Sequence, residues 1–197
     1  MENKIDDIKY IRSTMERSTK FLSLSGMSGV MAGVVALIGA SLAYLLIYKG
    51  YTVTGDLLVD MIILASLVLI LAVYFGYYFS LRKARKTGVK LFTPVTIQMV
   101  KDGGVPLVTG GLFCLMLIYH NCSYLVASAM LIFYGIAVIN AGARTYKDIK
   151  RLGACEIVLG LLGAFFAQYG LLFWAIGFGV MHILYGIIMH IKYDSKS

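Results

Sequence analysis

Charge-free stretches of apolar residues alternate with short polar segments along most of this chain. The first stretch carries no charge from Phe21 to Tyr48, and a later, longer one runs without a charge from Gly103 to Ala143. A transmembrane helix needs about 20 apolar residues, so the longer stretch has room for two helices with a turn at 120–122. The pattern predicts six transmembrane helices, at about 21–48, 57–81, 103–119, 123–143, 152–167 and 171–191.

A polar leader precedes the first apolar stretch. Four of its apolar residues recur at helical spacing: Ile5, Ile8, Ile11 and Met15. This spacing predicts an amphipathic helix over 3–20 that lies on the membrane surface or packs on other loops. The predicted fold class is therefore an all-α membrane protein, with a leader (1–20) and a six-helix transmembrane domain (21–197) built from three helical hairpins.

The basic residues indicate how the helices are oriented. Seventeen of the 18 lysines and arginines fall in the leader, the second and fourth loops and the tail, whereas Lys49 alone falls on the opposite side. Loops rich in Lys and Arg stay in the cytoplasm. We therefore expect a multi-pass protein of the cytoplasmic (inner) membrane of a bacterium, with the leader and both termini in the cytoplasm.

Composition supports the membrane assignment. The chain is 59% hydrophobic and 14% charged, with a mean hydropathy of +0.82, whereas a soluble domain has about 25% charged residues. This excludes a soluble globular protein. The net charge of +8 resides in loops beside apolar spans, so the expected partners are anionic membrane lipids and not nucleic acid.

Small residues four apart mark one face of the first span: Ser25, Gly29 and Gly33. This spacing lets two membrane helices bring their backbones close together. The face is suited to packing inside the bundle, or against a second copy of the chain or another membrane protein. The sequence leaves these alternatives open.

An internal repeat is visible when the chain is laid over itself so that Arg17 coincides with Arg144. This overlay brings the Arg-Lys leader and the pair Gly26/Gly33 onto the segment from Arg144 to Lys147 and the pair Gly153/Gly160. The third span carries the same pair as Gly103/Gly110 or Gly104/Gly111, and the even-numbered spans share Phe75-Gly76, Tyr134-Gly135 and Tyr185-Gly186. The pattern predicts a threefold repeat of one helical hairpin. Coincidence is the alternative for the third copy, because glycine is frequent in membrane helices.

Glycines among aliphatic residues extend through the second half of the chain. Gly153, Gly160 and Gly163 are followed by Ile176-Gly-Phe-Gly and Leu184-Tyr-Gly-Ile, and the segment from Gly110 through Tyr134-Gly-Ile has a related pattern. This pattern resembles the repeat of the HdeD-like short-repeat membrane proteins, small bacterial six-span proteins of which one is associated with acid resistance. The resemblance implies three hairpins and a role in stress response, and it carries over no catalytic motif. The longer polar N-terminus and the Arg-Lys leaders depart from that family.

His182 is the first candidate for chemistry, because it falls near the middle of the sixth span with Tyr185 one turn further along. Ionisable groups at that depth are costly and mark functional sites, and a histidine titrates in the physiological range. The alternative is a neutral histidine bonded to a neighbouring helix. His190 and His120 are predicted near the two membrane surfaces.

Three acids are the other candidates. Asp56 and Asp60 share a face at the outer end of the second span, and Glu156 falls in the first turns of the fifth. Asp60, Glu156 and His182 form a proton route if they face one cavity. The alternative is structural, because acids also stabilise the start of a helix. Glu156 is then expected beside Lys150 or Arg151.

Several classes of site are not indicated. The chain has no nucleotide-binding, metalloprotease or serine-hydrolase motif. Cys114, Cys122 and Cys155 are isolated, so neither a metal site, a cofactor nor a disulfide framework is predicted. Pro94 and Pro106 are placed at the start of the third span, so no broken helix is expected. The leading hypothesis is a non-enzymatic membrane protein that acts through lipid or protein contacts, and the alternative is a small proton-coupled transporter or channel.

Overall fold

The computed structural model describes residues 25–88, 90–145 and 147–194, and the regular structure within these ranges is helical. The predicted amphipathic helix over 3–20 lies outside them. The long helices are α2 (Gly26–Lys49), α3 (Leu57–Thr87), α4 (Pro94–Tyr119), α5 (Val126–Ala141) and α6 (Lys147–Phe165). Short 3₁₀ turns at Ser123–Leu125, Gly142–Arg144 and Ala167–Tyr169 adjoin them.

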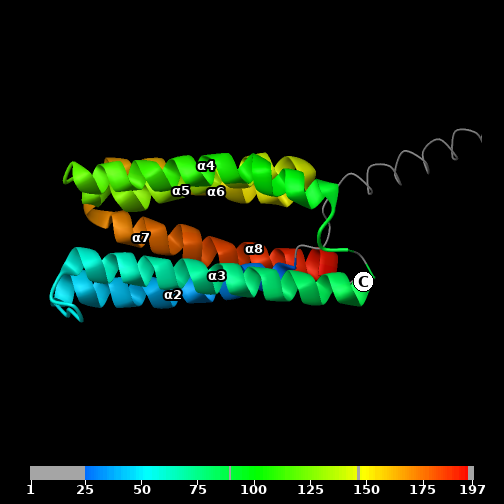
Figure 1. Cartoon of the computed structure of the whole chain (residues 1–197), viewed down its shortest axis with the longest axis horizontal. Coiled ribbons are helices and arrows are strands. Elements are labelled where there is room, and N and C mark those ends of the chain that lie inside the picture. Colours follow the sequence, from blue (N-terminus) through cyan, green and yellow to red (C-terminus); the bar gives the residue numbers. More distant parts are fainter. Residues whose placement is uncertain (1–24, 89, 146, 195–197) are drawn as a thin grey trace, which may run out of the picture.

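The last segment is less regular. It consists of α7 (Gly170–Trp174), a π-helical stretch (Ala175–Met181), α8 (His182–Met189) and a second π-helical turn (His190–Asp194). These pieces follow one another without a break and form one long rod in Figure 1. The segment is thus not broken, as expected, but the sequence did not predict its π-helical turns. Wide turns are rare and gather at functional sites, which draws attention to this segment.

Three groups of helices form the bundle. The α2–α3 hairpin lies on one side, α4, α5 and α6 lie on the other, and the α7–α8 rod runs between them (Figure 1). The rod packs against both α2 and α6, while α6 packs on α5 and α5 on α4. By contrast, α3 and α4 share no extended contact. In the described part of the chain, six rods therefore form an open ring, with its gap between α3 and α4.

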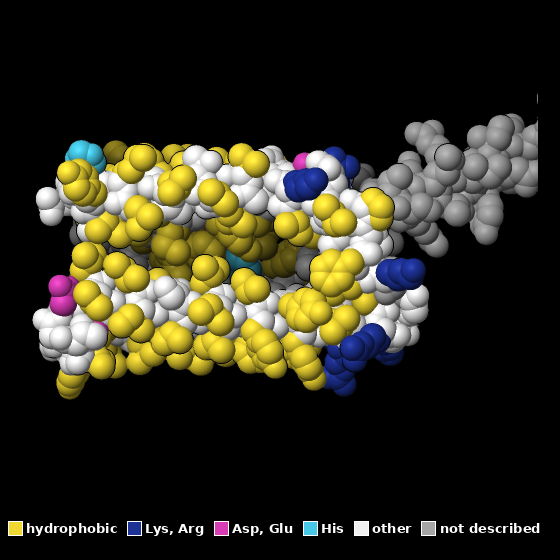
Figure 2. Space-filling view, viewed as in Figure 1, with side chains coloured by type: hydrophobic (Ala, Val, Ile, Leu, Met, Phe, Trp, Pro, Cys, Tyr) yellow, Lys and Arg dark blue, Asp and Glu magenta, His cyan; other side chains and the backbone are white. Residues whose placement is uncertain are grey.

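The two ends of the bundle differ in charge. One end holds the turns at 50–56, 120–122 and 166–169, and we call it the hairpin end. The other holds the end of α3 and the start of α4, and we call it the basic end. Figure 2 shows Lys and Arg side chains gathered at the basic end and hydrophobic side chains covering the flanks between the ends.

Among the described residues, five helical stretches are long and apolar enough to cross a membrane: Gly26–Lys49, Leu57–Thr87, Pro94–Tyr119, Ser123–Arg144 and Ala167–Asp194. The protein is therefore a multi-pass membrane protein by helix length and hydropathy. The remaining long helix, α6, overlaps the predicted fifth span (152–167) but begins five residues earlier and carries five charged residues: Lys147, Asp148, Lys150, Arg151 and Glu156.

Several predicted helix boundaries were wrong, each for a local reason. Helix α4 begins at Pro94, well before the predicted span, because Thr93 and Thr96 form a reciprocal cap there. Pro106 consequently lies inside α4 and not at its start. Helix α3 continues beyond Leu81 to Thr87, where Gly88 ends it in the left-handed conformation (φ 69°).

The predicted packing glycines lie at helix contacts within the bundle. Gly29 and Gly33 face the rod, where a Cβ on Gly29 would lie 3.2 Å from Cα of Gly186. Gly153 and Gly160 face α5, where a Cβ on Gly153 would lie 2.6 Å from the carbonyl oxygen of Gly135. Ser25 instead bonds the tail, through a contact of 3.4 Å to Asp194. Of the alternatives left open by the sequence, the small-residue face of α2 thus packs inside the bundle.

Candidate intramembrane site

Three helices on one side of the bundle bring together a tyrosine, a histidine and a glutamate. Tyr134 comes from α5, Glu156 from α6, and His182 from the start of α8, directly after the π-helical stretch. His182 is 6% exposed and Glu156 is fully buried. The two candidates that the sequence placed on separate spans are thus neighbours.

Hydrogen bonds fix the tautomer of His182. Its Nδ1 lies 3.0 Å from the carbonyl oxygen of Gly177, and its Nε2 lies 2.7 Å from the hydroxyl of Tyr134. A carbonyl only accepts, so Nδ1 carries the hydrogen, and Nε2 accepts from Tyr134 when the ring is neutral. This network supports the interpretation that His182 is a neutral histidine bonded to a neighbouring helix.

The carboxyl group of Glu156 is the unusual member of the cluster. Its Oε1 lies 3.4 Å from Nδ1 of His182, and neither of its oxygens has a hydrogen-bond partner among the residues that the structure describes. Its Oε2 lies against Gly177, where a side chain would collide with it. Polar groups in protein interiors nearly always have partners. Glu156 therefore needs either a proton of its own or a charge beside it.

Aromatic rings enclose the cluster on the side of the rod. The ring of Phe178 stacks on His182 at a centroid distance of 5.9 Å and contacts Tyr134 at 4.9 Å. Trp174 packs on Phe178 at 5.1 Å. His182 and Glu156 are buried, and electrostatic interactions are stronger where water is excluded. The π-helical stretch supplies both Phe178 and the carbonyl of Gly177.

The other predicted acids have structural positions at the hairpin end. Asp60 accepts hydrogen bonds from the amides of Val53 (2.8 Å) and Thr54 (3.1 Å), so it holds the loop between α2 and α3. Asp56 caps α3 by accepting from the amides of Leu58 and Val59. Neither joins the His182 cluster, so the predicted route from Asp60 to His182 is not formed.

Tyrosine is where the sequence prediction differs most from the observed cluster. Tyr185 lies on α8 with a buried hydroxyl, but the hydroxyl that bonds His182 belongs to Tyr134. Tyr134 was noted only as part of the repeated aromatic–glycine mark. This repeated aromatic–glycine pair was the signal in the sequence that could have identified Tyr134, because it aligns Tyr134 with Tyr185. Arg151, one of the predicted partners of Glu156, pairs with Asp148 instead (3.2 Å).

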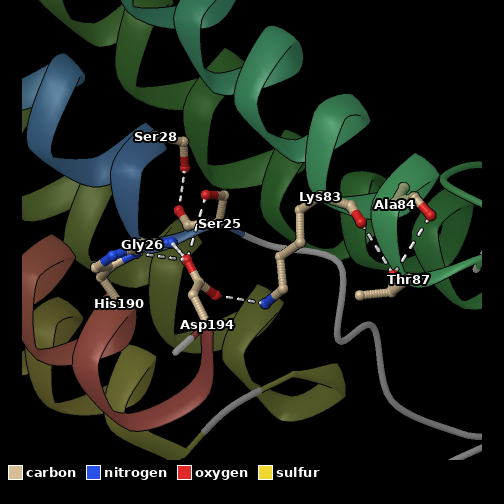
Figure 3. Close-up of polar contacts among 8 residues, drawn as sticks. All are labelled: Ser25, Gly26, Ser28, Lys83, Ala84, Thr87, His190 and Asp194. Carbon is tan, nitrogen blue, oxygen red and sulfur yellow. Dashed lines mark hydrogen bonds and ion pairs between the residues drawn. The ribbon is translucent and has the colours of Figure 1, made fainter. Parts of the chain in front are cut away.

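At the basic end, Asp194 ties three segments together (Figure 3). It accepts from the amide of Gly26 at the start of α2 (2.9 Å) and pairs with Lys83 of α3 (2.7 Å), with both side chains 11% exposed. His190 on the same turn lies 3.3 Å from it. Asp148 on α6 similarly binds Lys192 of the tail (2.6 Å). These contacts attach the end of the rod to α2, α3 and α6, and we assign them a structural role.

Comparison with known proteins adds no assignment to this geometry. Searches of protein-family models, curated proteins and solved structures find no match. Within 25–88, 90–145 and 147–194, no group of three or more His, Cys, Asp or Glu side chains is arranged to hold a metal ion. The cluster of Tyr134, Glu156 and His182 is therefore the candidate site on its own geometry.

Proposed function

We propose that this chain is a small proton-coupled membrane transporter or channel in which the Tyr134–His182–Glu156 cluster carries the proton. One observation supports this most: the carboxyl group of Glu156 is fully buried, has no hydrogen-bond donor in the described part of the chain, and lies 3.4 Å from Nδ1 of His182. A carboxyl and an imidazole at this distance share one proton between two arrangements. They are either a neutral acid beside a neutral ring, or a carboxylate beside an imidazolium.

The hydrogen-bond pattern gives the proton a direction of travel. A proton taken up at Nε2, on the side of Tyr134, makes His182 an imidazolium with hydrogens on both nitrogens. The Nδ1 hydrogen then passes to Oε1 of Glu156, which leaves a neutral ring and a neutral acid. Nε2 now keeps its hydrogen, and the Tyr134 hydroxyl must rotate to accept it. After Glu156 loses its proton toward the other side, the ring still carries its hydrogen on Nε2, so the cluster returns to its starting state only when the ring regains the tautomer with the hydrogen on Nδ1.

The membrane arrangement belongs to the same proposal. Helix α6 packs along α5, and four of its five charges lie in its first turns at the basic end. We therefore count α6 as a membrane crossing as well, which brings the total to six. An even number of crossings puts both termini on the same side, and the positive-inside rule makes that side the cytoplasm. The membrane is then the inner membrane of a bacterium, and the basic end faces its anionic lipids.

A second candidate is a non-enzymatic protein of the acid or stress response that acts through lipid or protein contacts. The resemblance to the HdeD-like proteins supports it, as does the close packing of glycines between helices. Two grooves at the hairpin end, of about 760 and 730 Å³, are not lined by His182 or Glu156. In this case the buried cluster is only a hydrogen bond that stabilises the bundle.

Proton flux into liposomes distinguishes the two candidates. The purified protein is reconstituted with a pH-sensitive dye inside, and flux is driven by a pH gradient. We expect flux in the wild type, no flux in Glu156→Gln or His182→Ala, and wild-type flux in the control His120→Ala, which alters an exposed histidine at the hairpin end. Equal flux in all four, or none above empty liposomes with the fold confirmed by circular dichroism, contradicts the transporter proposal.

A further inference from the structure

Two helix contacts in the bundle are built alike. Where α2 meets the rod, a Cβ on Gly26 would lie 2.5 Å from the carbonyl oxygen of Gly186. Where α6 meets α5, a Cβ on Gly153 would lie 2.6 Å from the carbonyl oxygen of Gly135. Only glycine permits such an approach, because any side chain would overlap a backbone atom. We call each of these contacts a glycine seam.

The likeness extends one step further along each seam. A Cβ on Gly33 would lie 3.0 Å from the amide of Ile183, and one on Gly160 would lie 3.0 Å from the amide of Ile132. Both isoleucines lie one turn before the glycine of their own helix. The four contacting positions on α6 and α5 are therefore matched in order and spacing by four on α2 and the rod.

A similar pattern, with valine in place of isoleucine, occurs a third time on α3 and α4, but there the two helices share no extended contact. Helix α3 has Gly76 with Val73 one turn before it, and α4 has Gly104 and Gly111 at the spacing of the other pairs. A Cβ at any of these three glycines has no neighbour within 4 Å. Val73 is 62% exposed. The third seam is present in the sequence and open in the structure.

The open faces look toward each other across a groove. Ile62 lies four turns before Gly76 on the same face of α3, and Ile118 lies two turns after Gly111 on the same face of α4. Both line the apolar groove of about 730 Å³ at the hairpin end. Figure 2 shows this hollow between the α2–α3 hairpin and α4, with mainly hydrophobic side chains and a histidine side chain on its floor.

We propose that α3 and α4 close on each other in a second conformation, with Gly76 against Gly104 and Val73 against Gly111. This closure forms the third seam, completes the ring of three hairpins and removes the groove that opens toward the membrane. It stands independently of the proposed proton site, because no residue of that site contributes to it.

Depth in the bundle supports this register. Gly76 lies three turns before the end of α3 at Thr87, and Gly104 lies nearly three turns after the start of α4 at Pro94. At a rise of about 1.5 Å per residue, these positions are about 16 and 15 Å from the same end. Only residues 88–93 connect the two helices. Because the paired glycines already lie at similar depths, α3 and α4 can close without sliding along each other. A short connection also favours contact within one chain over contact between two copies.

Distances between two spin labels test the closure in the full chain. The three native cysteines are replaced by serine, and labels are attached through Ile63→Cys on α3 and Leu115→Cys on α4, both exposed positions near the hairpin end. Packed helix axes lie about 8–10 Å apart, so the closed state adds a shorter component to the distance distribution measured in lipid nanodiscs.

Two variants test whether the shorter distance comes from the proposed seam. Gly104→Leu should remove the shorter component without unfolding the protein, because the open structure has room for the side chain. Val105→Leu, at the next position along the helix and 70% exposed, should keep the component. A single distance, or a shorter component that Gly104→Leu leaves intact, overturns the proposal. Loss of the component on dilution with unlabelled protein also overturns it, since the seam would then form between two copies.

Discussion

Glu156 is the residue whose replacement separates a chemical role from a structural one. A buried polar group without a partner destabilises a fold, and an apolar group of similar volume removes that cost. His182 keeps its bonds to Gly177 and Tyr134 when Glu156 is absent. We therefore predict that Glu156→Leu has an unchanged or higher melting temperature in detergent, while its proton flux is lost. A lower melting temperature would show that Glu156 has a partner after all.

Tyr134 gives the matching prediction for the other nitrogen of His182. Tyr134→Phe removes one hydrogen bond of 2.7 Å, and hydrogen bonds between membrane helices contribute about 0.6 kcal/mol on average. We expect a loss of stability of about that size, measured by reversible unfolding in mixed micelles, together with a much slower proton flux. Tyr124→Phe is the control, because Tyr124 is exposed at the hairpin end. Equal flux in both variants would restrict Tyr134 to a structural role.

At the residue scale, the sequence identified His182 and Glu156 separately but not as a pair. The depth of each residue in the membrane could be predicted from the hydropathy pattern, because it depends only on the position of the residue along its own span. Their contact depends on how α6 and the rod are rotated and on the wide turn at Ala175–Met181, and neither leaves a mark in the order of apolar residues. Tyr134 was missed for the same reason, since its hydroxyl reaches His182 from a third helix.

At the scale of helices, the glycine seams predict where a single methyl group is tolerated. In Gly153→Ala the new Cβ would meet a carbonyl oxygen at 2.6 Å, whereas in Gly104→Ala it meets nothing within 4 Å. Overpacking of this kind costs about 1–3 kcal/mol. We expect Gly153→Ala to unfold at a lower denaturant concentration than the wild type. Gly104→Ala should unfold at the same concentration as the wild type. Similar losses in both variants would mean that the third seam is already closed.

Elements were predictable where one apolar run makes one helix. The hydropathy pattern predicted the approximate positions of the described helices, and five stretches are long and apolar enough to cross a membrane, because length and charge decide which stretches suit a membrane. Their ends were less predictable. The cap at Thr93 and Thr96 starts α4 within a polar stretch, so this helix extends beyond its apolar part. Because of this extension, Pro106 lies inside α4 and not at its start.

At the scale of the whole molecule, Asp194 joins the end of the α7–α8 rod to the α2–α3 hairpin at the basic end. Its bonds reach α2 through Gly26 and α3 through Lys83. Hydrogen bonds to charged groups contribute about 1.5–3 kcal/mol, so Asp194→Asn should lower the free energy of unfolding by an amount of that order. The control is Asp102→Asn, because the Asp102–Arg144 pair is more exposed (28% and 41%). Exposed pairs contribute at most about 1 kcal/mol. Equal losses would contradict the role of Asp194 as a tie.

Orientation is the last property of the whole molecule that follows from its charges. We predict that the basic end faces the cytoplasm, because the lysines and arginines in the described part of the chain, Lys49 excepted, belong to segments at that end. In a chain without native cysteines, His120→Cys places one thiol at the hairpin end and Arg85→Cys places one at the basic end, both at exposed positions. A membrane-impermeant maleimide should label the first in intact cells, and the second only after the cells are opened. The reverse pattern would invert the protein, and protons entering the cluster by way of Tyr134 would then travel in the opposite direction across the membrane.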